Sequence, residues 1–149
     1  MSEARVHIDA DPEVVYGLVA DVTRMGEWSP ETVSADWLDG ATEATPGARF
    51  KGKNKRKLSW STTCTVTAAD PGRELAFDVG KGETRWRYRF EPADGGTDVT
   101  ESFEIVRAPG GIGRFFTRLA TGSTWDERDA DLVAGMDTTL ANLKTAAEP

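Results

Sequence analysis

The sequence is poor in the residues that build disulfides, metal sites and histidine-based catalytic sites. It has one cysteine, Cys64, and one histidine, His7, among 149 residues. A single cysteine excludes an intramolecular disulfide, and one Cys with one His supplies too few ligands for a Cys/His metal site. A nucleophile–histidine mechanism would have to use His7, which lies in the first strand-like segment. We expect no metal and no cofactor.

Long apolar runs and an excess of positive charge are also missing. No stretch approaches the roughly 20 apolar residues that cross a bilayer, and the N-terminus has no signal-peptide apolar run. We therefore expect a cytoplasmic protein without membrane insertion. The net charge of −7 argues against nucleic acid as a partner, because phosphate contacts need clustered positive charge. The basic stretch "RFKGKNKRK" carries no aromatic residues at its outward positions, which favours a solvated strand face that discourages edge pairing.

The length predicts one domain spanning 1–149. A short strand, "RVHID", leads into a helix in which Asp11 is a good N-cap and Pro12 suits the first helical position. A second helical turn follows at "TRMGEWSP". Six strand-like segments come next, separated by turn signals such as "DPG" and "ADGG", and they predict an antiparallel meander.

The last segment predicts a long amphipathic helix. Thr124 and Glu127 fit a capping box, and apolar residues recur at helical spacing up to Leu143. A sheet with one apolar face and a helix with one apolar face should pack together. We therefore expect the sheet to curl around this helix.

The segment "RWRYRFEP" alternates between two kinds of side chain. Trp86, Tyr88 and Phe90 fall on one face of a strand, and three arginines fall on the other. Neighbouring strands alternate in the same sense, with Phe77 and Phe103 on the inner face. Such aromatic rows either fill a solid core, which is the commoner case, or wall a cavity.

Glu101 interrupts the inner face of its strand. It lies between Val99 and Phe103, where a lone carboxylate would be costly to bury and burial would raise its pKa. One interpretation places Glu101 near a strand end or beside an arginine. The other has it facing an internal cavity and contacting a ligand, beside further polar groups at Asn54, Thr62 and Tyr88.

Several stretches carry a resemblance to a known superfamily. "VHIDADPEVVYGLVADVTRMGEWSP", "DPGRELAF", "TRWRYRFEPADGGTDVTESFE" and "AGMDTTLANLK" resemble the START/Bet v 1-like (SRPBCC) superfamily, in particular its bacterial polyketide cyclase/dehydrase-like branch. The resemblance implies an α+β helix-grip fold: a seven-stranded antiparallel sheet curled around the C-terminal helix, with a hydrophobic cavity between them. The cavity wall that it implies consists of Trp28, Phe50, Asn54, Trp60, Phe77, Trp86, Tyr88, Phe90, Glu101, Phe103 and Met136.

Three functions remain open at this point. The first is binding of a small hydrophobic molecule, lipid-like or aromatic, oriented by Glu101, Asn54 and Tyr88. The second is a cyclase or dehydratase in which Glu101 takes a proton next to a carbonyl and Tyr88 donates to the developing enolate oxygen. The third is a protein-interaction module that uses an exposed Phe115 or Trp125. Phe115 and Phe116 are otherwise expected at the cavity mouth, and the oligomeric state is left open.

Overall fold

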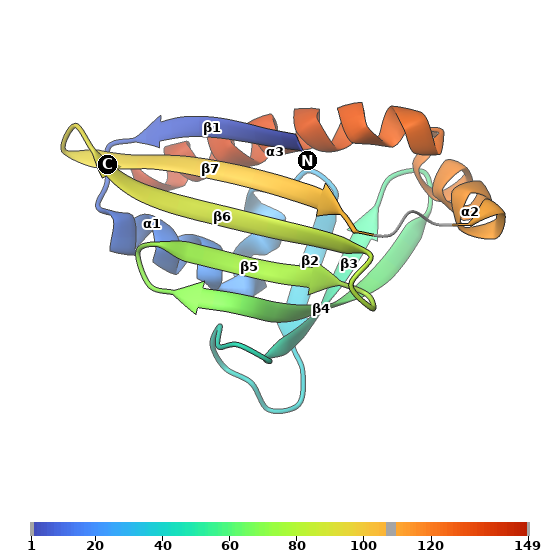
Figure 1. Ribbon diagram of the computed structural model, residues 1–149, viewed down its shortest axis with the longest axis horizontal. Helices are drawn as coiled ribbons and strands as arrows, with labels where there is room; N and C mark the ends of the chain where they lie inside the picture. The colour runs from blue at the N-terminus through green and yellow to red at the C-terminus, as the bar shows by residue number, and fades with distance from the viewer. Residues whose placement is uncertain (1, 107–109, 149) are drawn as a thin grey trace.

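The computed structural model describes residues 2–106 and 110–148, and Figure 1 shows its arrangement. The strands form one antiparallel sheet of seven. In chain order the elements are β1 (Ser2–Ile8), α1 (Pro12–Ala20), the 3₁₀ helix η1 (Val22–Glu27), β2 (Thr32–Trp37), β3 (Arg49–Lys55), β4 (Ser59–Asp70), β5 (Glu74–Val79), β6 (Thr84–Ala93), β7 (Gly96–Ile105), α2 (Gly111–Thr121) and α3 (Trp125–Ala147).

The sheet is an open meander to which the first strand is added at one edge. The spatial order is β1-β7-β6-β5-β4-β3-β2, so β2 to β7 pair consecutively and β1 joins the far side of β7. This confirms the predicted antiparallel meander. The basic strand β3 exposes its lysines as expected, but it lies between β2 and β4. The expectation that these lysines protect a sheet edge is therefore wrong, since the edge strands are β1 and β2.

The long helix α3 begins at the predicted capping box. The Thr124 hydroxyl accepts the Glu127 amide hydrogen at 3.2 Å, and the Glu127 carboxylate accepts the Thr124 amide hydrogen. Figure 1 shows α3 running beside β1 and the sheet curling around it. Its residues Met136, Leu140 and Leu143 are buried against the inner face of the sheet. The helix-grip architecture is thus confirmed.

The inner face of the sheet is covered differently at its two ends. At one end α1 packs against β5 and β6, and Tyr16 meets Phe90 edge-to-face with the ring centroids 5.6 Å apart. This end is a solid core. At the other end the inner face looks toward the N-terminal half of α3, and there the packing leaves a cavity.

The outer face carries the expected cross-strand charge pairs. Arg85 makes two hydrogen bonds to the Asp78 carboxylate, at 2.8 and 3.2 Å. Arg87 and Arg89 lie 3.8 and 3.9 Å from Glu74. Each such pair contributes little stability. Together the pairs keep this face polar, so the arginine side of β6 faces solvent and its aromatic side faces inward.

Within residues 2–106 and 110–148, no helix is long and apolar enough to pass through a membrane.

Candidate functional site

A cavity of about 550 Å³ lies between the curled sheet, α3 and the segment that joins η1 to β2. Small-molecule sites commonly measure roughly 300–1,000 Å³. Its wall receives side chains from β3 to β7 and from α3. The predicted residues that line it are Phe50, Asn54, Trp60, Phe77, Trp86, Tyr88, Glu101 and Met136.

The greater part of the wall is aromatic or aliphatic. Phe50 and Phe77 meet edge-to-face with centroids 5.2 Å apart, and Trp86 stands next to them on β6 because it pairs with Phe77 across the strands. Met136 and Leu132 close the opposite side from α3. The alternation of the strands thus places one continuous apolar surface around the cavity.

A buried polar pair interrupts this apolar surface. Tyr88 and Glu101 face each other directly across β6 and β7, and the Tyr88 hydroxyl donates to Glu101 Oε2 at 2.6 Å. Glu101 lies in the middle of β7, and its hydrogen-bond partner is a tyrosine. The interpretation that it sits at a strand end or beside an arginine is therefore wrong.

Burial controls the protonation of this pair. Desolvation raises the pKa of Glu101 to about 8, although the hydrogen bond from Tyr88 opposes the shift. Burial and the neighbouring carboxyl group raise the pKa of Tyr88 well above its ordinary value. Both groups are therefore mainly neutral at pH 7.

One oxygen of Glu101 is left over. Oε1 is buried and has no hydrogen-bond partner among the described residues, whereas Oε2 is held by Tyr88. A buried polar atom without a partner costs roughly 1–3 kcal/mol. Because Glu101 also lines the cavity, a ligand there is well placed to supply the partner.

A second polar group lies on β3 and β4. The Asn54 side-chain amide donates to Thr62 Oγ1 at 3.2 Å, and both residues line the cavity. The Thr32 hydroxyl approaches Asn54 Oδ1 at 3.5 Å. These groups satisfy one another, so they add polarity to the wall without an unpaired atom.

An ionic cluster that the sequence did not reveal also lines the cavity. Arg128 on α3 donates two hydrogen bonds to Glu31, the longer at 2.6 Å, and its guanidinium lies 5.9 Å from the centre of the Trp60 ring. Arg56 donates to Asp131 at 2.6 Å. The cluster joins α3 to the β3–β4 hairpin and to the segment before β2. Its members are far apart in the chain, and only Arg128 and Asp131 share a helical spacing, so the sequence offered no signal.

Three predicted wall residues lie elsewhere. Phe90 is in the solid core against Tyr16, and Phe103 is buried behind Trp86, with the two rings 5.3 Å apart. Trp28 is buried after η1, where Asn142 donates to its carbonyl oxygen. The alternation placed Phe90 and Phe103 on the correct face, but it does not tell which positions along that face are covered by other side chains.

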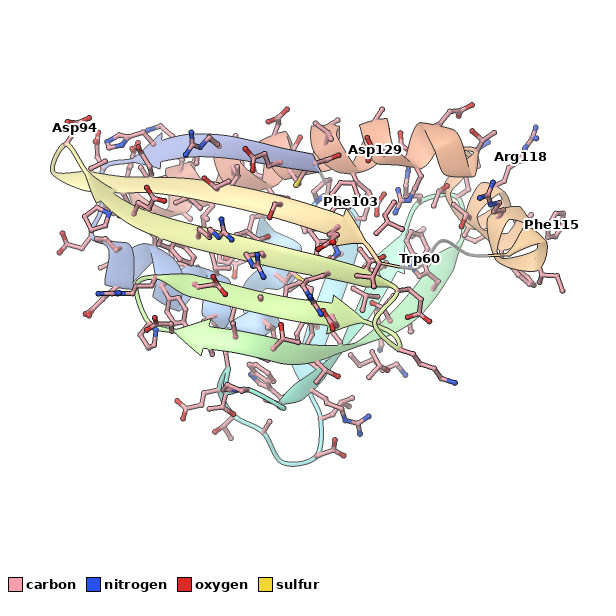
Figure 2. All side chains as sticks on the ribbon, viewed as in Figure 1. Trp60, Asp94, Phe103, Phe115, Arg118 and Asp129 are labelled. Atoms are coloured by element: carbon pink, nitrogen blue, oxygen red, sulfur yellow. The ribbon has the colours of Figure 1, made fainter. Side chains whose placement is uncertain are left out.

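The two residues predicted at the cavity mouth lie on α2. Phe115 and Phe116 are 63% and 59% exposed, and neither lines the cavity. Figure 2 shows Phe115 on the side of α2 that is turned away from the sheet. Trp125, predicted as an alternative partner contact, has its side chain outside the described residues. Among the residues that the structure describes, no group of three or more His, Cys, Asp or Glu side chains is arranged to hold a metal ion.

Comparison with known proteins places this geometry in context. A family model described as "Polyketide cyclase / dehydrase and lipid transport" matches residues 2–148. No curated protein matches the sequence. Among solved structures, the KanY protein (ms6282) is 20% identical with a TM-score of 0.72, and the comparison covers 99% of this chain and 96% of KanY.

Two further structures are similar. The Polyketide_cyc-like protein Cgl2372 from Corynebacterium glutamicum is 28% identical with a TM-score of 0.58, covering 97% of this chain and 90% of Cgl2372. BexL, a di-domain ARO/CYC from the BE-7585A biosynthetic pathway, is 18% identical with a TM-score of 0.71. That comparison covers 99% of this chain and 50% of BexL, so the chain corresponds in length to one half of it.

Proposed function

We propose that this chain, which belongs to the polyketide cyclase/dehydrase and lipid-transport family, binds a small, mostly apolar molecule in the cavity between its sheet and α3. The family confirms the resemblance to the START/Bet v 1-like superfamily noted in the sequence. The observation that carries the proposal is the buried Tyr88–Glu101 pair beside the aromatic part of the wall, with Glu101 Oε1 unpaired among the described residues. A site of this kind orients a ligand that buries the rest of its surface.

The chemistry of the wall specifies the ligand in outline. Apolar area removed from water favours binding by roughly 25 cal/mol per Å². At the polar end, a neutral Glu101 offers its hydroxyl hydrogen to a carbonyl or hydroxyl oxygen of the ligand. An anionic group at this position would be removed from water beside the carboxyl group of Glu101 and the phenol of Tyr88, and neither carries a positive charge that could pair with it. The ligand expected here is therefore uncharged at the end that reaches Tyr88 and Glu101.

Native mass spectrometry of the purified protein tests the proposal. We expect a non-covalent adduct that disappears after organic extraction and is recovered in the extract as an apolar molecule carrying at least one oxygen. Titration with the neutral dye N-phenyl-1-naphthylamine provides a second readout. A protein that carries no adduct and does not bind this dye would contradict the proposal.

A second candidate function is a cyclase or dehydratase, and the protonation of Glu101 bears on it. A general base must be ionised, and with a pKa of about 8 only a minor fraction of Glu101 is ionised at pH 7. The ionised carboxylate would take the proton next to a substrate carbonyl, and the electron pair would move to the carbonyl oxygen. Tyr88 already donates to Glu101, so it could donate to that oxygen only by giving up this hydrogen bond.

The two candidates predict different pH profiles. Turnover through Glu101 as a base should rise with pH up to about 8, and Glu101→Gln should abolish it while binding of the neutral dye persists. If the protein binds its ligand without converting it, no turnover that rises with pH is expected. The assay is loss of a carbonyl substrate identified from the extract, measured from pH 6 to 9. Equal turnover by the wild type and Glu101→Gln would remove Glu101 from any catalytic role.

A further inference from the structure

We propose that α2 is a docking helix for an anionic lipid bilayer, which it binds peripherally through an apolar face made of Ile112, Phe115, Phe116 and Leu119. This proposal does not depend on the cavity binding a ligand. On an ordinary surface helix the apolar side chains face the protein, but on α2 they face solvent. The four large apolar side chains of α2 point to solvent, and their exposed fractions range from 49% to 77%.

The helix periodicity makes this face continuous. The four positions follow the spacing i, i+3, i+4 and i+7, which places them on one stripe of the helix. The rings of Phe115 and Phe116 meet edge-to-face with centroids 5.8 Å apart. A contiguous exposed apolar patch of this kind marks an interaction surface, because isolated soluble domains rarely leave one uncovered.

The opposite side of α2 shows why the apolar face cannot turn inward. Toward the body of the protein the helix presents small or polar residues, and Thr121 is buried with its hydroxyl bonded to the Thr117 carbonyl. The Ala120 carbonyl accepts a hydrogen bond from the Leu58 amide of the β3–β4 hairpin at 2.9 Å. These contacts fix the rotation of α2, and Figure 2 shows Phe115 and Arg118 directed away from the sheet.

Charge identifies the partner. The segments 44–69 and 110–124 contain eight of the 18 Lys and Arg residues and none of the 25 Asp and Glu residues. They meet at the end of α2, where Lys57 lies against Gly122 and Arg118 occupies the last turn. Arg49 and Arg56 are paired with Asp39 and Asp131, whereas Lys57 and Arg118 flank the apolar stripe with positive charge. That combination favours the headgroup region of a membrane with anionic lipids.

The same charges disfavour a second copy of the chain as the occupant. In a two-fold dimer through α2, each stripe would meet its own copy, and the flanking basic residues would face like charges. A nucleic acid would satisfy the basic residues but would leave Ile112 and Leu119 uncovered. A bilayer satisfies both features, because acyl chains receive the apolar side chains and lipid phosphates receive the cations.

Docking through α2 would place the cavity near the membrane. Ile105, at the end of β7, and Arg56 and Trp60, in the hairpin that bonds to α2, all line the cavity. The side of the molecule that meets the bilayer is therefore the side on which the ionic cluster lies.

Vesicle flotation tests the proposal. We expect the wild-type protein to float with vesicles of phosphatidylcholine and phosphatidylglycerol at 70:30, and to float much less with phosphatidylcholine alone or at high salt. Phe115→Ser with Phe116→Ser should lower the apparent affinity by about tenfold or more, since both rings leave the interface. Arg118→Gln should lower it by about fivefold.

The matched control is Val14→Ser with Val33→Ser, which removes two exposed apolar side chains, 52% and 62% accessible, that lie outside α2. It should float like the wild type. A Phe115→Cys variant labelled with an environment-sensitive fluorophore adds a direct readout, because the native Cys64 is buried. Its emission should shift to the blue on anionic vesicles.

Three results would overturn the proposal. One is a wild-type protein that does not float with anionic vesicles at low salt. Another is flotation that the paired Phe115 and Phe116 substitutions leave unchanged. The third is a dimer in light scattering that these substitutions dissociate while flotation stays the same, which would assign the apolar face to a second copy. Dye binding in the cavity should be unchanged in all these variants, so a failure here is distinct from a failure of the proposed function.

Discussion

Replacing Glu101 with glutamine should remove a loss of folding stability that develops as the pH rises. The pKa of Glu101 in the folded protein is about 8, against an ordinary value of 4.5, chiefly because the carboxyl group is buried. Between these two values the folded state holds a proton that the unfolded state has lost. Stability therefore falls as pH rises through this window, since the folded state binds more protons than the unfolded state.

The size of the effect follows from the shift. A difference of about 3.5 pKa units at about 1.4 kcal/mol per unit is roughly 5 kcal/mol, lost progressively from about pH 4.5 to 8. Glutamine is nearly isosteric, stays neutral and still accepts the Tyr88 hydroxyl. Glu101→Gln should therefore match the wild type near pH 5 and exceed its free energy of unfolding by roughly 3–5 kcal/mol at pH 9.

Urea unfolding followed by tryptophan fluorescence at pH 5 to 9 measures this difference. Glu104→Gln is the control, because Glu104 lies on the same strand with its side chain exposed. It should run parallel to the wild type over the whole range. If the Glu101→Gln curve also runs parallel to the wild type, Glu101 does not sit in a desolvated site, and the reasoning about the cavity wall is refuted.

Three further predictions concern other parts of the fold. Burial raises the pKa of the Cys64 thiol to about 12, so at pH 8 a thiol reagent should react with the native protein much more slowly than with the urea-unfolded chain, and equal rates would contradict this. The pKa of His7 is raised, chiefly by its hydrogen bond with Asp98. His7→Asn should therefore lower the melting temperature more at pH 6 than at pH 9. Thermal melts that show the same loss at both pH values would refute the role of Asp98. Thr124→Ala should lower the free energy of unfolding by about 1 kcal/mol in urea titrations, because it breaks the capping box, and an unchanged midpoint would count against it.

The sequence predicted the faces of the sheet because strand alternation is a local property. The aromatic residues at 86, 88 and 90 all turn inward, and the exceptional Glu101 on the next strand lies opposite Tyr88 as a consequence of hairpin register. The capping box at Thr124 is likewise local. These features need only neighbouring residues, so periodicity and cap chemistry were enough.

Position along a strand was not predictable in the same way. Tyr88 lines the cavity, whereas Phe90, two residues further along the same face, is in the solid core. The difference comes from α1, whose Tyr16 covers Phe90. Which helix covers which half of an inner face depends on how the sheet curls and on tertiary packing, and alternation carries no signal for either.

The ionic cluster and the orientation of α2 were missed for the same reason. Glu31, Arg56 and Arg128 meet only because the sheet curls around α3. The apolar residues of α2 recur at helical spacing, but this spacing does not tell which side of the helix faces the body of the protein. Phe115 and Phe116, expected at the cavity mouth, are exposed on α2, and small residues of this helix face the body instead.

The central claim is that the cavity beside Tyr88 and Glu101 holds the ligand, and Gly135 allows the most direct test. Gly135 lies on α3 and lines the cavity, and a β-carbon there would meet only Pro30, at 3.7 Å. Gly135→Ala should bind N-phenyl-1-naphthylamine like the wild type and gain about 0.5–1 kcal/mol of stability from better helix propensity.

Gly135→Leu extends a larger side chain from the same position toward the cavity, so the measurement is dye affinity and the native mass spectrum of the two variants side by side. The account predicts that Gly135→Leu remains folded, loses the bound adduct and binds the dye at least tenfold more weakly than Gly135→Ala. Equal binding by a folded Gly135→Leu variant would contradict it, and would place the ligand outside this cavity.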